Sequence, residues 1–294
     1  MPVRCTSVIM HRTGKPSCLL GRVSSNVRRH IQHLLVRKQN PVFAIAQIPM
    51  FWELSDNVRA IKQALVVARR AGADFCAFSE LALTGFHRRI VDWARPEVSE
   101  PAVLEVRGAA ADVGIAAVFG APTYLGSARL NSHLFVASDG SLVGAISKIG
   151  LTEPEATFFQ RGTERPVLTL EGMRCSAVIC REVEDKEDVL GQLAGTGVEV
   201  IFWPGQMRPD PAKPITDPPE HVAQAQHLAR RTGAYVLQTN WPNALNRPEE
   251  SENTGHSACI DPEGTLLFRL PKQGFGVAAF ELGEKNFRWY PSDA

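Results

Sequence analysis

The stretch PVFAIAQIP, residues 41–49, decides the fold class because it is the first segment with a clear structural pattern. Its nearly continuous apolar run predicts a buried strand. A helix is predicted over 56–71, ended by Gly72, and a second strand, ADFCAFSE, over 73–80. The apolar face of that helix would consist of Val58, Ile61, Leu65 and Ala68. A strand, a helix and a strand in this order indicate an α/β fold.

The rest of the chain continues this pattern and adds hairpins. Helices are predicted at about 98–113, 185–195 and 220–232. Two turns, Asp139-Gly140 and Glu263-Gly264, are typical of tight hairpins. We therefore expect a mixed sheet system with helices on the outside, in a single domain over 41–294. Nine further strands are predicted, at 114–122, 131–138, 141–148, 174–180, 198–204, 234–240, 257–264, 265–270 and 275–282.

Residues 1–40 differ from this domain in charge. They contain eight Lys or Arg residues and no Asp or Glu, although the whole chain has a net charge of only +1. Their composition predicts a basic, disordered N-terminal extension. An organellar transit peptide and a nucleic-acid-contacting arm are the alternatives, and a secretory signal is disfavoured because no apolar h-region is present.

Composition and cysteine usage exclude several classes of protein. The six cysteines are scattered without a CxxC pair, which indicates reduced thiols, a cytoplasmic location and no structural zinc. The eight histidines form no HExxH-like pair, so metal catalysis is not expected. No apolar run reaches the roughly 18–20 residues that span a bilayer. The acidic net charge of the body disfavours nucleic acid as its partner.

Three residues that could perform chemistry each end a predicted strand. Glu80 ends DFCAFS, Lys148 ends LVGAIS and Cys180 ends RCSAVI. Ligands of α/β sheets commonly bind beyond the carboxyl ends of strands, so these side chains could converge. A nearby cation favours a thiolate, and a carboxylate can move its proton. Taken singly, a cysteine in CSAVIC is more often structural, and a charged residue at a strand end more often begins a solvated loop.

The sequence segments around these residues resemble those of the nitrilase superfamily of carbon–nitrogen hydrolases. The segments FAIAQIP, FSELALTGF, SKIGLTEPEATFFQRG, SAVICRE and SACIDPEG follow the family's order and cover residues 43 to about 282. The resemblance implies that Glu80 is the general base, that Lys148 stabilises the oxyanion and that Cys180 is the nucleophile. A second family glutamate corresponds to Glu155, which would orient the lysine or position substrate.

The same resemblance implies the architecture and the reaction. The expected fold is a four-layer αββα sandwich, paired into a homodimer or a higher homo-oligomer. The expected substrate is a small amide, carbamoyl compound or nitrile, which is hydrolysed with water through a thioester-type intermediate, without cofactor, metal or membrane. Amide or N-carbamoyl hydrolysis is favoured by the breadth of the family. A nitrilase is one alternative, and a catalytically silent binding protein is another.

Two residues beside the motifs depart from the family pattern. Ser79 stands where the family motif has proline, and Arg181 where an aromatic residue often follows the cysteine. Arg181 could bind a substrate carboxylate, or it could pair with Glu182 or Glu184 at the surface. Glu182 replaces the usual aspartate and keeps the acid, so it is expected to preserve local anchoring.

Further substrate contacts are predicted from two other strand ends. Trp203 and Gln206, in FWPGQM, match the position of a loop that lines the family's pocket. Asn240, in QTNWPN, follows another strand. Trp203 and the tryptophan that follows Asn240, Trp241, could equally be core or interface anchors. The proline-rich segment 207–220 is long enough for a functional loop, with a surface detour as the alternative.

Overall fold

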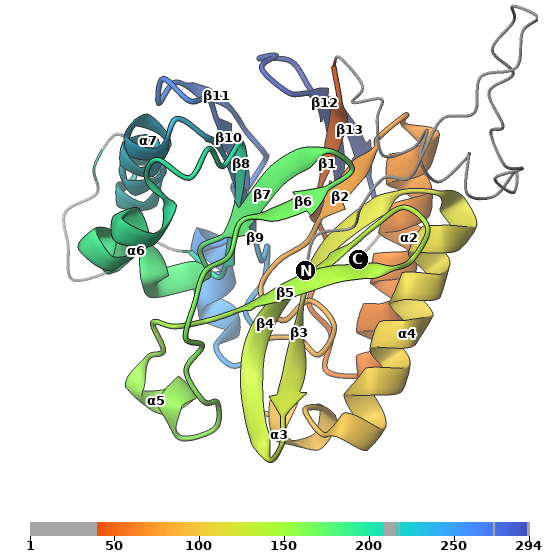
Figure 1. The fold of residues 1–294 in the computed structure, drawn as a ribbon. Helices are drawn as coiled ribbons and strands as arrows, with labels where there is room; N and C mark the ends of the chain where they lie inside the picture. Colours follow the sequence, from red (N-terminus) through yellow and green to blue (C-terminus); the bar gives the residue numbers. More distant parts are fainter. Residues whose placement is uncertain (1–39, 208–215, 217, 273, 293–294) are drawn as a thin grey trace, which may run out of the picture. The chain divides into compact units, whose positions relative to one another are not determined.

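The computed structural model describes residues 40–207, 216, 218–272 and 274–292 (Figure 1). The predicted N-terminal extension therefore lies outside the described residues except for Asn40, which is exposed. Most of the proline-rich segment 207–220 also lies outside them. All described residues belong to one compact unit, in agreement with a single domain from residue 41 onward.

The first sheet has seven strands in the order β13-β12-β1-β2-β3-β4-β5. Its centre, β1-β2-β3, is parallel, as the early strand–helix–strand pattern predicts. The remaining neighbours are antiparallel and include the hairpin that turns at Asp139-Gly140, where Gly140 has a φ of 81°. The strands are β1 (Val42–Gln47), β2 (Phe75–Ala77), β3 (Ala116–Leu125), β4 (Ala128–Val136), β5 (Leu142–Ser147), β12 (Gly276–Glu281) and β13 (Arg288–Pro291).

The second sheet has six strands in the order β11-β10-β9-β8-β7-β6. Its centre, β7-β8-β9, is again parallel, and β6, β10 and β11 are antiparallel to their neighbours. The predicted turn at Glu263-Gly264 joins β10 to β11. The strands are β6 (Leu168–Leu170), β7 (Met173–Ala177), β8 (Val200–Gly205), β9 (Tyr235–Asn240), β10 (Ala258–Ile260) and β11 (Leu266–Arg269).

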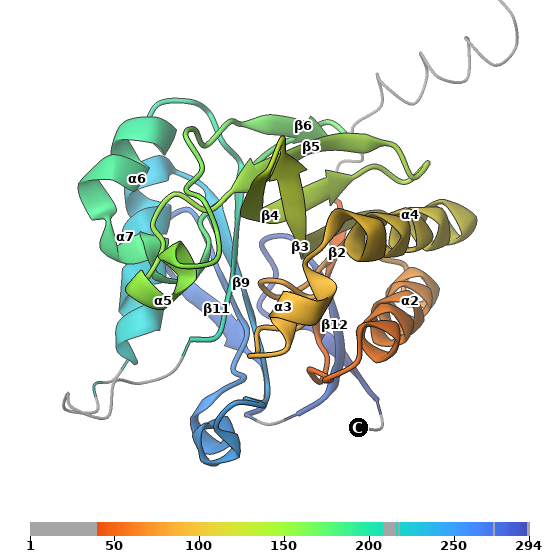
Figure 2. The same cartoon turned by 90° about the horizontal axis from the view of Figure 1, so that it is seen from below.

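The two sheets pack face to face with helices outside, which confirms the αββα sandwich. Figure 2 shows α2 (Leu54–Arg70) and α4 (Pro96–Val113) on one side of the strands, and α6 (Lys186–Leu193) and α7 (Glu220–Thr232) on the other. Apolar side chains of both sheets form the central core, and each helical layer has its own core. Short helices are α3 (Ile90–Trp93), α5 (Glu153–Ala156), η1 (Cys180–Glu184) and η2 (Pro248–Asn253).

Two polar contacts join the sheets near the carboxyl end of β2. The hydroxyl of Thr239 donates to the carbonyl of Phe78 at 2.8 Å, and the indole N–H of Trp241 donates to the carbonyl of Glu80 at 2.8 Å. Both donors are fully buried. The end of β9 therefore holds the turn after β2 across the space between the sheets. Within the described residues no helix is long and apolar enough to cross a membrane.

Candidate active site

Lys148 is the centre of a buried ion network. It follows β5 directly, and its backbone N–H donates to the carbonyl of Asn131 on β4 at 2.8 Å. Its ammonium group, only 1% exposed, donates to Oε1 of Glu80 at 2.8 Å and to Oε1 of Glu155 at 2.6 Å. Burying a cation is tolerable when carboxylates pair with it in this way. The structure thus brings three of the predicted residues into direct contact.

The orientation of Glu155 comes from the start of α5. Thr152 caps this short helix, and its hydroxyl accepts from the N–H of Glu155. The other oxygen of Glu155, Oε2, accepts from the N–H and the hydroxyl of Thr152 at 2.8 and 2.9 Å. This reciprocal capping box leaves Oε1 directed at Lys148. The sequence TEPE therefore encodes both a helix start and the position of a site carboxylate.

Cys180 lies on a strained turn at the end of β7. The strand ends at Ala177, three residues earlier than predicted, and Cys180 begins η1 with a φ of 52°. A non-glycine residue in this region is strained and held by its surroundings. The indole N–H of Trp203 donates to the carbonyl of Cys180 at 2.8 Å. A Cβ placed on Gly205 would lie 3.3 Å from the Cys180 Cβ, so β8 approaches the cysteine closely.

Glu182 anchors this turn to the loop after Lys148. Its Oε2 accepts from the N–H of Ile179 at 2.6 Å, and its Oε1 accepts from the N–H groups of Ile149 and Gly150. Arg165, buried beside it, approaches the same Oε1 within 3.1 Å. The anchoring expected of this residue is confirmed. One carboxylate couples the position of the cysteine to that of the lysine.

The pKa values in this network follow from burial and from the neighbouring charges. Burial raises the pKa of Glu80 above 4.5, against the opposing effect of Lys148. Burial alone would lower the pKa of Lys148, but the charge of Glu80, followed by the charges of Cys180 and Glu155, raises it overall. Lys148 is therefore a permanent cation between two acids.

The cysteine itself is a neutral thiol in this environment. Burial and the charge of Glu80 raise the pKa of Cys180 to about 12, although Lys148 and the backbone N–H of Gln206 lower it. Lys148 does lower the pKa of the thiol, as expected of a nearby cation, but burial and the charge of Glu80 outweigh this effect. Attack by this sulfur requires a base that removes its proton, and Glu80 is the carboxylate beside it.

The remaining predicted residues have structural partners. Arg181 pairs with Asp185 at 2.9 Å and with Glu184 at 3.7 Å. Glu184 is one of the two surface partners that were predicted, whereas Asp185 was not among them. Trp203 is buried in the core with residues of α6 and α7, and its indole N–H holds the carbonyl of Cys180. Its side chain is only 1% exposed.

The other two predicted contacts differ from each other in exposure. Asn240 is buried, accepts from the N–H of Met207 and donates to the carbonyls of Met207 and Gly255, so its amide braces the loop after β8. Gln206 is half-buried and contributes its backbone N–H to the Cys180 sulfur. Gln206 therefore has a backbone hydrogen bond to the proposed nucleophile.

Sequence reasoning missed two residues that touch Glu80. The side-chain amide of Asn131, on β4, donates to Glu80 Oε1 at 2.8 Å. Gly120, on β3, lies so close to the turn after β2 that a Cβ there would come within 2.0 Å of the Leu81 nitrogen. The predicted strand NSHLFVAS begins with three polar residues, and this was the available signal for Asn131. No sequence pattern pointed to Gly120.

His133 is a buried histidine two residues along β4 from Asn131. Neither ring nitrogen has a hydrogen-bond partner among the described residues, and burial lowers its pKa to about 3. The unfolded chain binds a proton there at its ordinary pKa of 6.5, whereas the folded protein does not until about pH 3. Stability should therefore fall as pH drops through this window.

The variant His133→Leu is expected to flatten that dependence. The slope of unfolding free energy against pH should decrease by up to about 1.4 kcal/mol per pH unit between pH 6.5 and 3. Urea unfolding at several pH values measures both slopes. A variant with the same slope as the original protein would show that His133 is not buried in its neutral form.

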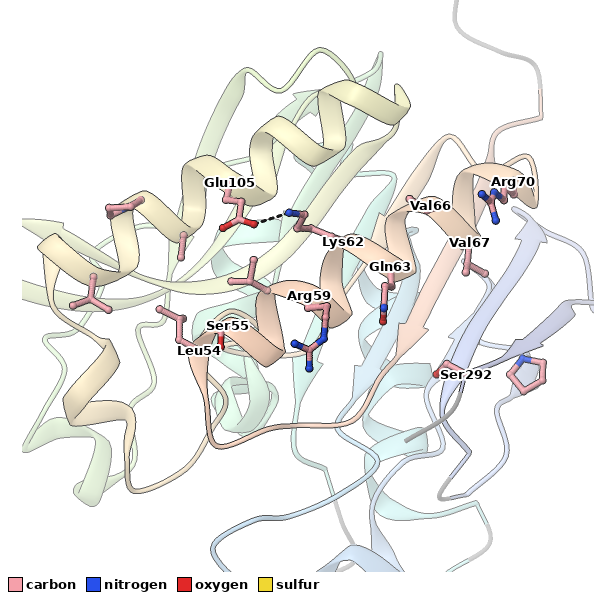
Figure 3. A pocket seen from close by; sticks show the side chains of 15 residues that line it. Leu54, Ser55, Arg59, Lys62, Gln63, Val66, Val67, Arg70, Glu105 and Ser292 are labelled. Carbon is pink, nitrogen blue, oxygen red and sulfur yellow. Dashed lines mark hydrogen bonds and ion pairs between the residues drawn. The ribbon is translucent and has the colours of Figure 1, made fainter.

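A groove of about 990 Å³ lies elsewhere, between α2, α4 and the end of β13 (Figure 3). Two of its cations pair with nearby carboxylates, Lys62 at 2.6 Å from Glu105 and Arg59 at 2.8 Å from Asp56. None of the residues of the ion network or the cysteine turn lines it. We assign it no part in the chemistry. Among the described residues, no three His, Cys, Asp or Glu side chains could together hold a metal ion.

A comparison with known protein families identifies the family of this chain. The model of the carbon-nitrogen hydrolase family matches residues 43–283. The chain belongs to the carbon–nitrogen hydrolase family. This confirms the resemblance read from the motifs and identifies the protein as a carbon–nitrogen hydrolase. A comparison with curated proteins finds no match.

Solved structures share the fold of this carbon–nitrogen hydrolase. An amidase from Nesterenkonia sp. is 23% identical with a TM-score of 0.71, and the match covers 85% of this chain and 92% of that one. A mutant of that amidase, described with the acetamide moiety of fluoroacetamide covalently added at its active site cysteine, is 22% identical with a TM-score of 0.72, covering 84% and 92%. A glutamine-dependent NAD+ synthetase from Acinetobacter baumannii is 19% identical with a TM-score of 0.70, covering 87% and 48%.

Proposed function

We propose that this carbon–nitrogen hydrolase cleaves small amides with Cys180 as nucleophile, Glu80 as general base and Lys148 as oxyanion stabiliser. The observation that carries the proposal is the buried Glu80–Lys148–Glu155 network beside a half-buried cysteine on a strained turn. The amidases among the structural neighbours support an amide as substrate. The predicted homo-oligomer and cytoplasmic location stay predictions.

In the first half-reaction, Glu80 removes the thiol proton as the sulfur attacks the amide carbon. The base is needed because the Cys180 thiol, with a pKa of about 12, is protonated at neutral pH. The C–N double-bond character is lost and negative charge develops on the carbonyl oxygen, where the ammonium of Lys148 stabilises it. Glu80 then transfers its proton to the nitrogen, the C–N bond breaks and ammonia leaves. A thioester on Cys180 remains.

In the second half-reaction, water replaces ammonia. Glu80 takes a proton from water as the oxygen attacks the thioester carbon, and Lys148 again faces the oxyanion. The C–S bond breaks, the sulfur regains a proton from Glu80 and the carboxylic acid is released. Amide and water are converted to acid and ammonia, and the enzyme returns to its initial state. Glu155 takes no proton in this scheme; it fixes the ammonium position.

Ammonia release and mass spectrometry test the proposal together. We expect ammonia from a short aliphatic amide in a panel with N-carbamoyl amines, N-carbamoyl amino acids and nitriles. Fluoroacetamide, whose acetamide moiety adds to the active site cysteine in a mutant of the related amidase, should add an acetamide group to the peptide that contains Cys180. Turnover of nitriles alone would replace the amide assignment with a nitrilase. If no substrate is turned over and no adduct forms on Cys180, the results would favour a catalytically silent binding protein.

The activity should also have an acid limb that belongs to Glu80. Because burial raises the pKa of Glu80 above 4.5, the base becomes protonated, and therefore inactive, at a higher pH than an exposed glutamate would. We expect kcat/KM to fall with decreasing pH at a midpoint above 4.5, and the Glu80→Gln variant to lack both turnover and this limb. A midpoint at or below 4.5 would assign the limb to another group.

A further inference from the structure

The two oxygens of Glu80 have different environments. Oε1 accepts two hydrogen bonds, from Asn131 Nδ2 at 2.8 Å and from Lys148 Nζ at 2.8 Å. Oε2 is buried and has no hydrogen-bond partner among the described residues. A buried carboxylate oxygen without a partner is costly, so it calls for an explanation in terms of function.

Asn131 contacts both charged residues of the proposed catalytic group. Its side chain donates to Glu80, and its backbone carbonyl accepts from the N–H of Lys148 at 2.8 Å. It is only 1% exposed and lies within β4, which is paired on both sides, with β3 and β5. A residue held this firmly can fix the plane of a neighbouring carboxylate.

We propose that Asn131 is a positioning residue that holds Glu80 by Oε1 and so reserves Oε2 for proton transfer with Cys180 and the leaving amine. This inference rests on the proposed function. The amide of Asn131 is a suitable partner because it donates to a carboxylate without adding charge. Lys148 alone could hold Oε1 while the carboxylate rotates about that contact. Two donors on the same oxygen restrict this rotation.

Asn131 should also tune the acidity of Glu80. A donor to the ionised carboxylate favours ionisation, and the Asn131 hydrogen bond lowers the pKa of Glu80 against the effect of burial. The charged and titratable groups around Glu80 are Lys148 after β5, Glu155 from α5 and Cys180 from η1. His133, on β4, is neutral above about pH 3. Removing the amide therefore changes the acid limb without removing a charge.

The test compares Asn131→Leu and Asn131→Asp with the original protein. Leucine has similar size but no donor, and aspartate has the same shape but places a second carboxylate beside Glu80. We expect the acid limb of kcat/KM to move to higher pH by about one unit in Asn131→Leu and further in Asn131→Asp. We also expect kcat to fall about 10-fold or more with little change in KM.

A second readout separates this inference from the proposed function. The rate of Cys180 alkylation by iodoacetamide, followed by peptide mass spectrometry, reports on base-assisted thiol reactivity without any amide turnover. The acid limb of the alkylation rate should move to higher pH in Asn131→Leu and further in Asn131→Asp. The Glu80→Gln variant should show no acid limb. If no amide is cleaved but alkylation shifts as described, the proposed function fails and the positioning role of Asn131 survives.

The matched control is Asn57→Leu, which removes another buried amide. The side-chain amide of Asn57 hydrogen-bonds to the backbone of Phe51 through both its oxygen and its nitrogen, away from the residues of the proposed site. This variant should lose stability, while the acid limbs of kcat/KM and of the Cys180 alkylation rate stay where they are in the original protein. If both Asn131 variants keep the limbs of the original protein, even with reduced kcat, Asn131 has only a structural role and the inference is overturned. Should Asn131→Leu fail to fold, the isosteric Asn131→Asp decides.

Discussion

Replacing Lys148 with methionine is expected to abolish turnover and to destabilise the fold at the same time. Methionine keeps the apolar stem but removes the cation that Glu80 and Glu155 share at 2.8 and 2.6 Å. Two buried carboxylates are then left without compensation, and breaking a buried pair in this way costs about 3–5 kcal/mol. Loss of oxyanion stabilisation alone should reduce kcat by about 10²–10³-fold. Urea unfolding and ammonia release measure the two effects.

The pH dependence of this loss identifies its cause. Without its cation, the pKa of Glu80 rises further, so the folded variant can relieve the cost by binding a proton there. In the unfolded chain, the Glu80 carboxylate binds a proton only near its ordinary pKa of 4.5. The destabilisation relative to the original protein should thus be greatest at neutral pH and decrease as pH falls toward 4.5. A difference that stays constant with pH would point to packing rather than to charge.

Two further variants serve as references for Lys148→Met. Cys180→Ala should lose turnover completely while its stability changes by no more than about 1 kcal/mol, because it removes the nucleophile and no charge. Combining Lys148→Met with Glu80→Gln and Glu155→Gln removes the buried charges as a set. It should regain much of the lost stability and none of the activity. Failure to regain stability would contradict the electrostatic explanation.

Gly120→Ala is expected to have the second largest effect. A Cβ at this position would lie 2.0 Å from the Leu81 nitrogen and 2.8 Å from the Glu80 carbonyl carbon. These are backbone atoms, so no side-chain rotation can relieve the clash, and either β3 or the turn after β2 must move. We expect a loss of about 1–3 kcal/mol in stability. A shift of Glu80 of about 1 Å should reduce kcat/KM about 10²-fold.

Gly108→Ala is the matched control for this substitution. Gly108 is exposed on α4, and a Cβ there would meet no atom within 4 Å. Since alanine favours a helix over glycine, stability should stay equal or rise by up to about 1 kcal/mol, with unchanged turnover. If Gly120→Ala retained full activity, the close approach between β3 and the Glu80 turn would not be what positions the base.

The secondary structure was predicted well wherever local patterns are strong. The helix predicted at 220–232 coincides with α7, and both predicted glycine turns join antiparallel strands. The strands β6 and β13, which have three and four residues and lie at the edges of their sheets, were missed. Residues 178–180 were predicted as strand because they are apolar, but Cys180 leaves the strand conformation with a positive φ.

What the sequence by itself determined is the identity of the proposed catalytic residues and the α/β architecture. Polar residues at the ends of apolar strands indicate Glu80, Lys148 and Cys180 as candidates, because strand ends in such sheets converge at one edge. The resemblance of the surrounding motifs to the family adds Glu155 and the proposed role of each residue. Motifs of this kind are local, so they can be read without knowing how the chain folds.

Only the tertiary structure decided how these residues act on one another. The partners of Glu80 and Cys180 come from strands distant in sequence, as Asn131 and Gly120 illustrate. The protonation of Cys180 depends on the sum of burial, Glu80, Lys148 and the Gln206 backbone, and that sum raises the pKa of the thiol although Lys148 lowers it. Such balances depend on distances and on exclusion of water, which no local sequence pattern specifies.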